Sequence, residues 1–217
     1  MITDERIARY IESLEAELPP LLRKIENEAL QDQVPIIKRP TRSMLRFMIY
    51  QNQPKQILEV GAAVGFSSLF MSEYLPLEGN ITTIEKQPKR IQEAKKNFQM
   101  ASREDRITLL EGDAMDILPK LLSEGKQYDM IFMDAAKGQY IHFMPDVLAL
   151  LTLGGTLISD NVLQDGDIVE SRFAVTRRNR TIHYRMREYL YSLTHDETLE
   201  TIVLPIGDGI TMSKKIL

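Results

Sequence analysis

Polar side chains that could do chemistry stand directly after two apolar runs in the second half of the chain. The run YDMIFM is followed at once by Asp134 and, three residues later, by Lys137. The run GTLIS is followed by Asp160 and Asn161. Short apolar runs bounded by polar residues are typical of buried strands, and the carboxyl ends of parallel strands share one edge of a sheet, where ligands bind. The side chains of Asp134, Asp160 and Asn161 are therefore expected to converge.

Three of the four side chains offer hard oxygen donors. The carboxylates of Asp134 and Asp160 and the amide of Asn161 suit a hard cation, magnesium first and manganese or calcium next. The chain has no cysteine and only three histidines, which excludes thiolate zinc sites, iron–sulfur clusters and cysteine nucleophiles and disfavours a histidine-rich metal site. Aspartate and asparagine are also common as caps and turn residues after strands, so a structural interpretation of each residue alone stays open.

A glycine-bracketed turn follows an earlier apolar run, QILEV. It starts at Glu59 inside the run, passes through Gly61 and Gly65, and reaches Ser67 and Ser68 at an expected helix start. The glycines allow the backbone to approach a ligand closely, and either serine can cap the helix. The third glycine of the G-x-G-x-x-G fingerprint is missing, which disfavours a nicotinamide cofactor. A plain glycine turn is the alternative interpretation.

Two more expected strands end in acids. The run NITTIE ends in Glu85, where a carboxylate could accept hydrogen bonds from both hydroxyls of a ribose. The run RITLLEG is followed by Asp113 and Ala114, which places another acid near a purine edge. Solvated acids at strand ends are the alternative, so each feature alone is a weak signal.

The elements that position these residues follow from hydrophobic spacing. Residues 1–32 carry apolar side chains at helical spacing with a break at a Pro-Pro pair, so two short helices are expected, and a third is expected over residues 41–50. From Gln56 onward, β-rich runs alternate with helical stretches. This alternation predicts an α/β fold in which helices cover both faces of a parallel sheet.

The last two β-like runs flank Gly207-Asp208-Gly209. A connection this tight predicts an antiparallel hairpin that closes the sheet. The sequence contains no internal repeat or low-complexity tract. We expect one domain over residues 1–217, with an N-terminal helical cap over residues 1–50 and an α/β core over residues 55–217.

Composition narrows the classes of function. Of 217 residues, 43% are hydrophobic and 27% are charged, which suits a globular chain with a large core. No apolar run approaches the roughly 20 residues that span a bilayer, and the charged, amphipathic N-terminus lacks the apolar region of a signal peptide. We therefore expect a cytoplasmic protein with no membrane partner. The net charge of −4 means that nucleic-acid binding would need a local basic patch.

Such a patch follows the expected Asp160-Asn161 site. Between Ser171 and Arg187 there is no acid, and there are six arginines: Arg172, Arg177, Arg178, Arg180, Arg185 and Arg187. A solvated helix face is the ordinary interpretation of a charge run. Because this run lies close to the expected site, contacts to RNA phosphates are plausible, and arginine is suited to bidentate phosphate binding.

The motifs together resemble known enzymes. Acid-x-Gly-x-x-x-Gly, an acid after the second strand and Gly-Asp-Ala after the third resemble the class I methyltransferases that depend on S-adenosylmethionine (SAM). DAAKGQY with SDNV resembles the metal-dependent catechol O-methyltransferase-like family, which includes plant caffeoyl-coenzyme A methyltransferases. The resemblance runs from about Val34 to the C-terminus, where PIGDG matches the family's late hairpin. It implies a Rossmann-like, seven-stranded, mostly parallel sheet with a C-terminal antiparallel hairpin and N-terminal helices.

The resemblance also implies roles for single residues. It implies Asp134, Asp160 and Asn161 as ligands of a divalent cation. It implies Lys137, with Asp134, as catalytic, the lysine being either a neutral base or a protonated partner of the acceptor oxygen. The implied cofactor contacts are Ile37, Glu59, Gly61, Ser67, Glu85, Asp113, Ala114 and Asp134. One departure is Ala62, where many bacterial members have threonine or valine.

The acceptor is the last inference from the sequence. VPI near residue 34, DAAKGQY, DNVL, the arginine-rich insert and PIGDG are similar to the bacterial tRNA 5-hydroxyuridine methyltransferases. This resemblance implies methylation of wobble 5-hydroxyuridine to 5-methoxyuridine in a tRNA anticodon loop, and a homodimer. The 5-hydroxyl lies beside the 4-carbonyl and can chelate a cation. An O-methyltransferase of catechol-like or phenolic small molecules, and a non-catalytic RNA-binding or oligomerisation module, remain as alternatives.

Overall fold

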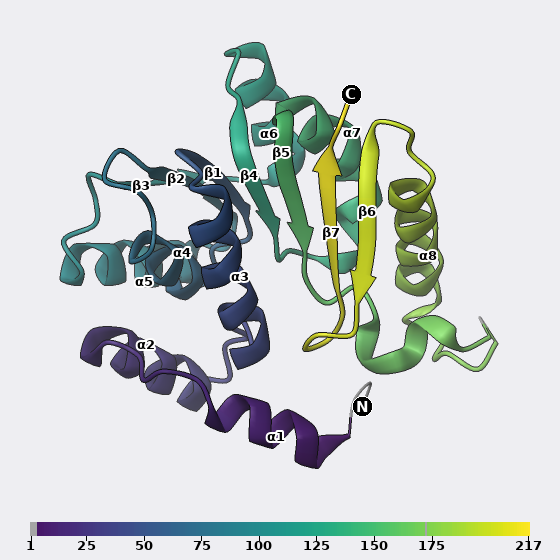
Figure 1. Ribbon diagram of the computed structural model, residues 1–217, viewed down its shortest axis with the longest axis horizontal. Helices are drawn as coiled ribbons and strands as arrows, with labels where there is room; N and C mark the ends of the chain where they lie inside the picture. The colour runs from purple at the N-terminus through teal and green to yellow at the C-terminus, as the bar shows by residue number, and fades with distance from the viewer. Residues whose placement is uncertain (1–3, 172) are drawn as a thin grey trace.

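The sheet is the centre of the fold. The structure, a computed structural model, describes residues 4–171 and 173–217 (Figure 1). Within them, seven strands form one sheet in the order β3-β2-β1-β4-β5-β7-β6. The strands are β1 (Gln56–Val60), β2 (Asn80–Glu85), β3 (Ile107–Glu111), β4 (Tyr128–Met133), β5 (Leu151–Ser159), β6 (Leu199–Leu204) and β7 (Ile210–Lys215).

Strand directions follow the prediction. The pairs β2–β3, β1–β2, β1–β4 and β4–β5 are parallel, and β7 is antiparallel to both β5 and β6. The mostly parallel sheet with a C-terminal antiparallel hairpin is therefore confirmed. Because strands β1 to β4 are parallel, the residues that follow them reach the same edge of the sheet.

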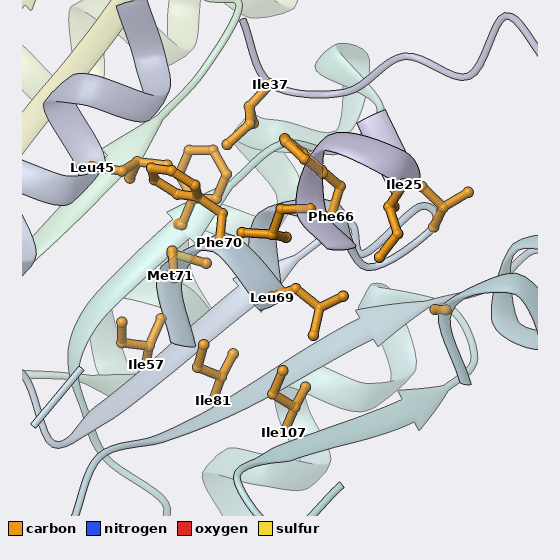
Figure 2. Close-up of a cluster of buried hydrophobic side chains, with 14 of the residues drawn as sticks. Ile25, Ile37, Leu45, Ile57, Phe66, Leu69, Phe70, Met71, Ile81 and Ile107 are labelled. Carbon is orange, nitrogen blue, oxygen red and sulfur yellow. The ribbon is translucent and has the colours of Figure 1, made fainter. Parts of the chain in front are cut away.

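Each face of the sheet carries its own hydrophobic core, because neighbouring side chains of a strand point to opposite faces. On one face, α2 (Pro20–Gln31), α3 (Arg39–Asn52), α4 (Phe66–Ser72) and α5 (Pro88–Met100) pack around Ile57, Ile81 and Ile107. Figure 2 shows these three isoleucines in a row beneath Leu69 of α4. On the other face, α6 (Ala114–Ser123), α7 (Tyr140–Leu150) and α8 (Arg180–Thr194) cover Leu58 and its neighbours. Helices on both faces confirm the α/β prediction.

The N-terminal helices were predicted, with small differences at their ends. The Pro-Pro pair lies between α1 (Glu5–Ser13) and α2, with Pro19 as the N-cap and Pro20 as the first residue of α2, a position that suits proline because an amide there has no partner within the helix. Helix α3 begins at Arg39 and ends at Asn52, two residues beyond the predicted helix at each end. No helix among the described residues is long and apolar enough to cross a membrane.

The hairpin between β6 and β7 holds the chain that leaves β5. The amide of Val162 donates to the carbonyl of Gly209 at 3.0 Å, and the amide of Leu163 donates to the carbonyl of Asp208 at 2.9 Å. Gly209 has a φ of +89°, and a Cβ atom on it would overlap the side chain of Leu163. The PIGDG motif therefore has a structural reason, since it fixes the backbone just after Asp160 and Asn161.

Candidate active site

A cavity of about 440 Å³ opens at the carboxyl ends of β1, β2 and β4. Most of the predicted site residues line it: Ile37, Gly61, Ser67, Glu85, Asp113, Ala114, Asp134, Lys137 and Asn161. Glu59 and Asp160 do not line it and are buried. The segment before α3 contributes Ile37, which Figure 2 shows close to Phe66 at the start of α4. The cavity thus brings together the glycine turn and the polar residues that follow β4 and β5.

The glycine turn touches the loop that follows β4. Gly61 has a φ of +108°, and a Cβ atom on it would overlap the carbonyl oxygen of Asp134. The amide of Asp134 in turn donates to the carbonyl of Val60 at 3.0 Å. Gly65 has a φ of +78°, and its Cβ atom would overlap the ring of Phe98. Both glycines are required by close approach and by backbone conformation.

Glu59 is a buried anchor below the glycine turn. Its Oε2 accepts hydrogen bonds from the hydroxyls of Ser68 and Thr83. Its Oε1 is buried and has no partner within the chain. Burial raises the pKa of Glu59, and the neighbouring hydroxyls of Ser67, Ser68 and Thr83 oppose that rise. The free Oε1 could accept a hydrogen bond from a ligand or from a water molecule.

The acids after β2 and β3 already hold backbone groups. Glu85 accepts from the amide of Ala63 at 2.8 Å through Oε2, and from the amides of Lys86 and Gln87 at 2.8 and 2.9 Å through Oε1. Glu85 therefore ties the glycine turn to the chain after β2. A carboxylate has about four acceptor sites, so three backbone bonds leave room for one hydroxyl more easily than for two.

Asp113 has a structural role as well as a place in the cavity. Its Oδ1 caps α6 by accepting from the amide of Met115 at 3.0 Å, and its Oδ2 accepts from Nζ of Lys86 at 3.2 Å. The bond from Met115 and the nearby Lys86 hold the pKa of Asp113 below its usual value. Asp113 therefore both caps α6 and lines the cavity, so its interpretation as a structural residue and its interpretation as a ligand contact are compatible.

The residues after β4 and β5 form a compact polar trio. Oδ1 of Asp134 accepts from the side-chain nitrogen of Asn161 at 3.1 Å, and Oδ1 of Asp160 accepts from the backbone amide of Asn161 at 2.7 Å. Asn161 has a φ of +61°, a left-handed conformation that is uncommon outside glycine and clusters at functional sites. Sequence spacing alone had predicted this convergence, and the described residues show it.

The two acids of the trio lie in an unfavourable setting for negative charge. Burial and the nearby charge of Glu59 raise the pKa of Asp134 to about 6, although Lys137 and Asn161 oppose the rise. Burial and the charge of Asp134 raise the pKa of Asp160 to about 7. The described residues contain no group of three or more His, Cys, Asp or Glu side chains placed to hold a metal. The trio has two such acids, and its third oxygen donor is an amide.

Tyr140 contacts the backbone segments that carry the trio, a role that could not be assigned from the sequence. Its buried hydroxyl accepts from the amide of Ala135 at 3.2 Å and lies 3.1 Å from the carbonyls of both Met133 and Asp160. The ring of Tyr140 packs edge-on against Tyr189 of α8, with 5.5 Å between centroids. The tyrosine of the DAAKGQY motif therefore joins the ends of β4 and β5.

Lys137 opens η1 (Lys137–Gln139), a 3₁₀ turn between β4 and α7. It is half-buried and lines the cavity. Its positive charge lowers the pKa of Asp134 against the effect of burial. Lys137 and Asp134 are thus close enough for their charges to interact.

The six arginines do not form one uniform patch. Arg172 lies outside the described residues, and Arg177 and Arg178 are exposed in the loop before α8. The other three donate to backbone carbonyls of their own chain. Arg180 donates to Val175 at 3.4 Å, Arg185 to Gly138 at 3.1 Å and Arg187 to Ile168 at 3.0 Å. Charge pattern alone could not separate these arginines from the exposed ones.

Known structures share this fold. The SAH-bound methyltransferase PaMTH1 of Podospora anserina matches with a TM-score of 0.85 and 26% sequence identity, over 97% of this chain and 94% of that one. The strand order, the antiparallel hairpin and the cavity at the strand ends are those of a class I, SAM-dependent methyltransferase. The predicted Rossmann-like methyltransferase fold is confirmed.

The model of the O-methyltransferase family matches residues 12–216, so the chain belongs to this family. A catechol O-methyltransferase of Niastella koreensis is 38% identical over 119 residues, which cover 54% of this chain and 54% of the relative. Caffeoyl-CoA O-methyltransferase 1 of Eucalyptus globulus is 32% identical over 166 residues, which cover 75% of this chain and 67% of the relative. The match thus spans about half the length of the first relative.

Proposed function

We propose that the protein transfers the methyl group of SAM to the 5-hydroxyl of 5-hydroxyuridine at the tRNA wobble position, with a divalent cation, magnesium first, bound at Asp134, Asp160 and Asn161. One observation carries the proposal. A single cavity is lined by the glycine turn, by Asp134 and Asn161, and by Lys137. A methyl donor on the turn and an acceptor at the polar trio would therefore meet inside one space.

The cofactor half of the cavity suits SAM. The whole cavity has a volume of about 440 Å³, which lies in the usual range for small-molecule sites. Glu85 offers a remaining acceptor position to a ribose hydroxyl, and the cavity wall at Ala114 is apolar enough for an adenine ring. The unpartnered Oε1 of Glu59 is an acceptor for the polar end of the cofactor or for a bridging water.

The polar trio suits a hard cation. The carboxyls of half-buried Asp134 and buried Asp160 have raised pKa values, and the amide of Asn161 lies beside them. These oxygen donors are of the kind that a hard cation binds. Rotation of the Asn161 amide would turn its oxygen, in place of its nitrogen, toward the bound ion. A bound divalent cation lowers the pKa of a coordinated hydroxyl and fixes its direction.

Residues of this chain supply the remaining chemistry. Methyl transfer from a sulfonium is an in-line displacement, so a bond forms between acceptor oxygen and methyl carbon as the bond from sulfur to that carbon breaks. Lys137 lines the same cavity, within which the proposed acceptor would lie. It either takes the hydroxyl proton or, when protonated, stabilises the oxyanion. Tyr140 and the β6–β7 hairpin hold the loops that carry these groups.

The tRNA part of the proposal rests on the exposed arginines. Arg177 and Arg178 project from a loop that follows β5, in a protein whose net charge is −4. Exposed guanidinium groups suit the phosphates of an anticodon loop, whose unpaired bases are easily presented to a pocket. The 5-hydroxyl and 4-carbonyl of the base supply the two adjacent oxygens that chelate a cation.

The decisive experiment is mass spectrometry of tRNA nucleosides. Hydroxyuridine-containing tRNA is incubated with the enzyme, SAM and magnesium, and a gain of one methyl group on 5-hydroxyuridine is expected. An Asp134→Ala variant provides the inactive control. Wild-type enzyme that leaves 5-hydroxyuridine unmodified, while cofactor is present in excess, would exclude this acceptor.

A catechol-like or phenolic acceptor is the second candidate, because the relatives named above are a catechol and a caffeoyl-CoA O-methyltransferase. The two candidates differ in what Arg177→Met with Arg178→Met should do. A tRNA enzyme loses affinity for tRNA, by about tenfold for two phosphate contacts at moderate salt, whereas turnover of a free catechol is unchanged. Lys55→Met with Lys126→Met, two exposed cations at the opposite sheet edge, is the matched control.

We also propose that the protein forms a homodimer through α1. Four apolar side chains of this helix and its C-cap are more than half exposed: Ile7, Tyr10, Ile11 and Leu14. An amphipathic helix with an exposed apolar stripe suits a protein interface. Light scattering should give twice the chain mass for the wild type and the single mass for Ile7→Asp with Ile11→Asp. A wild-type monomer at micromolar concentration would refute the dimer.

A further inference from the structure

One side of α8 packs against the loop that carries Lys137. Ile182, Arg185 and Tyr189 are spaced three and four residues apart, so they share a face of the helix. A Cβ atom on Gly138 would lie 3.5 Å from Ile182, in ordinary contact. The hydroxyl of Tyr189 hydrogen-bonds with Ser159 at the end of β5, at 2.6 Å. This face of α8 therefore spans from η1 to β5.

Arg185 makes the polar contact between this face and η1. Its Nη1 donates to the carbonyl oxygen of Gly138 at 3.1 Å, in a half-buried position. Gly138 is the residue directly after Lys137 in the 3₁₀ turn. A hydrogen bond from a guanidinium is charge-assisted and stronger than one between neutral groups. Arg185 thus holds the backbone of the turn from a separate element, 47 residues away in sequence.

The start of the same loop is fixed by other groups. The amide of Asp134 bonds to Val60, and the amide of Ala135 bonds to the hydroxyl of Tyr140. Within the turn, the amide of Gln139 donates to the carbonyl of Ala136 at 2.8 Å. These bonds hold the stretch near the polar trio, whereas the bond from Arg185 holds the far side of the turn against α8.

We infer that Arg185 is a positioning residue for the methyl-transfer reaction, because its hydrogen bond to Gly138 fixes the backbone from which Lys137 reaches the acceptor oxygen. This inference rests on the proposed function, which assigns Lys137 to the acceptor. Lysine has a long, flexible side chain, so the position of its Cα decides how often the ammonium or amine reaches the reacting oxygen. Arg185 is not among the residues that line the cavity and acts through the turn.

The test compares two arginine-to-alanine variants. Arg185→Ala removes the contact to η1. Arg106→Ala removes a similar half-buried contact at the amino-terminal edge of the sheet, where its guanidinium donates to the carbonyl of Gly79 at 2.9 and 3.1 Å. Each variant is assayed for kcat and KM with SAM and the acceptor that the wild type uses, for SAH affinity by calorimetry, and for Tm.

Arg185→Ala should lower kcat on the order of tenfold, since small displacements of a reacting group have large kinetic effects, while SAH affinity stays within about twofold of wild type. Guanidinium ion at millimolar concentration should restore part of the lost kcat, and Arg185→Lys should be intermediate because lysine lacks the planar fork. Arg106→Ala should lower Tm at least as much and keep kcat.

Three outcomes would overturn the inference. One is a folded Arg185→Ala enzyme with wild-type kcat. Another is a fall in kcat that Arg106→Ala reproduces and that guanidinium ion does not rescue, which would mark a general loss of stability. The third is full activity of Lys137→Ala, which removes the residue being positioned. Failure of the proposed function is seen separately, as a wild-type enzyme that methylates neither hydroxyuridine tRNA nor catechols.

Discussion

Glu59, Asp134 and Asp160 are acids at the same end of the sheet, Glu59 and Asp160 buried and Asp134 half-buried, and they differ in the groups that surround them. Glu59 receives hydrogen bonds from two hydroxyls, Ser68 and Thr83, at one oxygen. Asp134 and Asp160 share one asparagine, and the charge of Asp134 raises the pKa of Asp160. The fold thus supplies two hydroxyl donors to Glu59, whereas Asp134 and Asp160 each accept from one group of Asn161 and have pKa values raised to about 6 and about 7.

The largest expected effect separates chemistry from cofactor binding. Asp134→Ala should abolish the turnover that added magnesium or manganese supports, with a loss of at least about 100-fold, or about 2.7 kcal/mol of barrier. SAH affinity by calorimetry should largely persist, because the glycine turn and Glu85 belong to other loops. Metal-dependent turnover equal to wild type would rule out the proposed cation site.

Glu59→Ala should act mainly on stability and cofactor affinity. The substitution leaves the buried hydroxyls of Ser68 and Thr83 without their acceptor, so the free energy of unfolding should fall by about 2 kcal/mol. Urea titration measures the loss, with the isosteric Glu59→Gln as the milder control. If Glu59→Ala were as stable as wild type, Glu59 would not be the anchor described above.

Cation affinity should depend on pH in the direction that the raised pKa values set. Protons compete with the cation for both carboxylates. At pH 6, protonation of Asp160, whose pKa is about 7, should weaken cation binding about tenfold, and protonation of Asp134, whose pKa is about 6, should weaken it about twofold more. Affinity for magnesium should therefore drop about 20-fold from pH 8 to pH 6. Calorimetry of SAH-bound enzyme with magnesium measures it, and Asp160→Asn should flatten the dependence.

The smallest expected effect concerns stability without metal. The folded pKa of Asp160 lies above its unfolded value, so its contribution to stability is full below the unfolded value and is lost as pH rises through about 7. Asp160→Asn keeps the acceptor for the amide of Asn161 and removes the charge. At pH 8 and without metal it should raise the free energy of unfolding by about 1 kcal/mol, and at pH 5 the gain should shrink. If Asp160→Asn were less stable than wild type at pH 8, the charge of Asp160 would not be unfavourable in the folded protein, and the contrast drawn with Glu59 would be wrong.

Spacing along the sequence was enough to predict the elements and the meeting of Asp134, Asp160 and Asn161. Parallel strands bring their carboxyl ends to one edge, so any polar residue just after a strand must arrive there. Spacing was not enough to tell Glu59 from Asp134. Both are acids near a strand end, and they differ only in which hydroxyls and charges the tertiary structure places beside them.

The arginine-rich segment shows a second limit of sequence patterns. Six arginines without an acid predict a basic surface, and the exposed Arg177 and Arg178 fit that pattern. The pattern could not indicate that Arg185 and Arg187 bond to backbone carbonyls, because those acceptors belong to loops that become neighbours only after folding. Tyr140 was missed for the same reason, since its partners are carbonyl groups that every residue has.

The contact between Gly61 and the carbonyl of Asp134 has a consequence for how such an enzyme can change over time. A side chain at position 61 would have no room and would push the glycine turn away from the loop that follows β4. Under the proposed function, that displacement would also move the methyl donor away from the acceptor. Loops that do not take part in this contact, such as the one before α8, can change without that penalty.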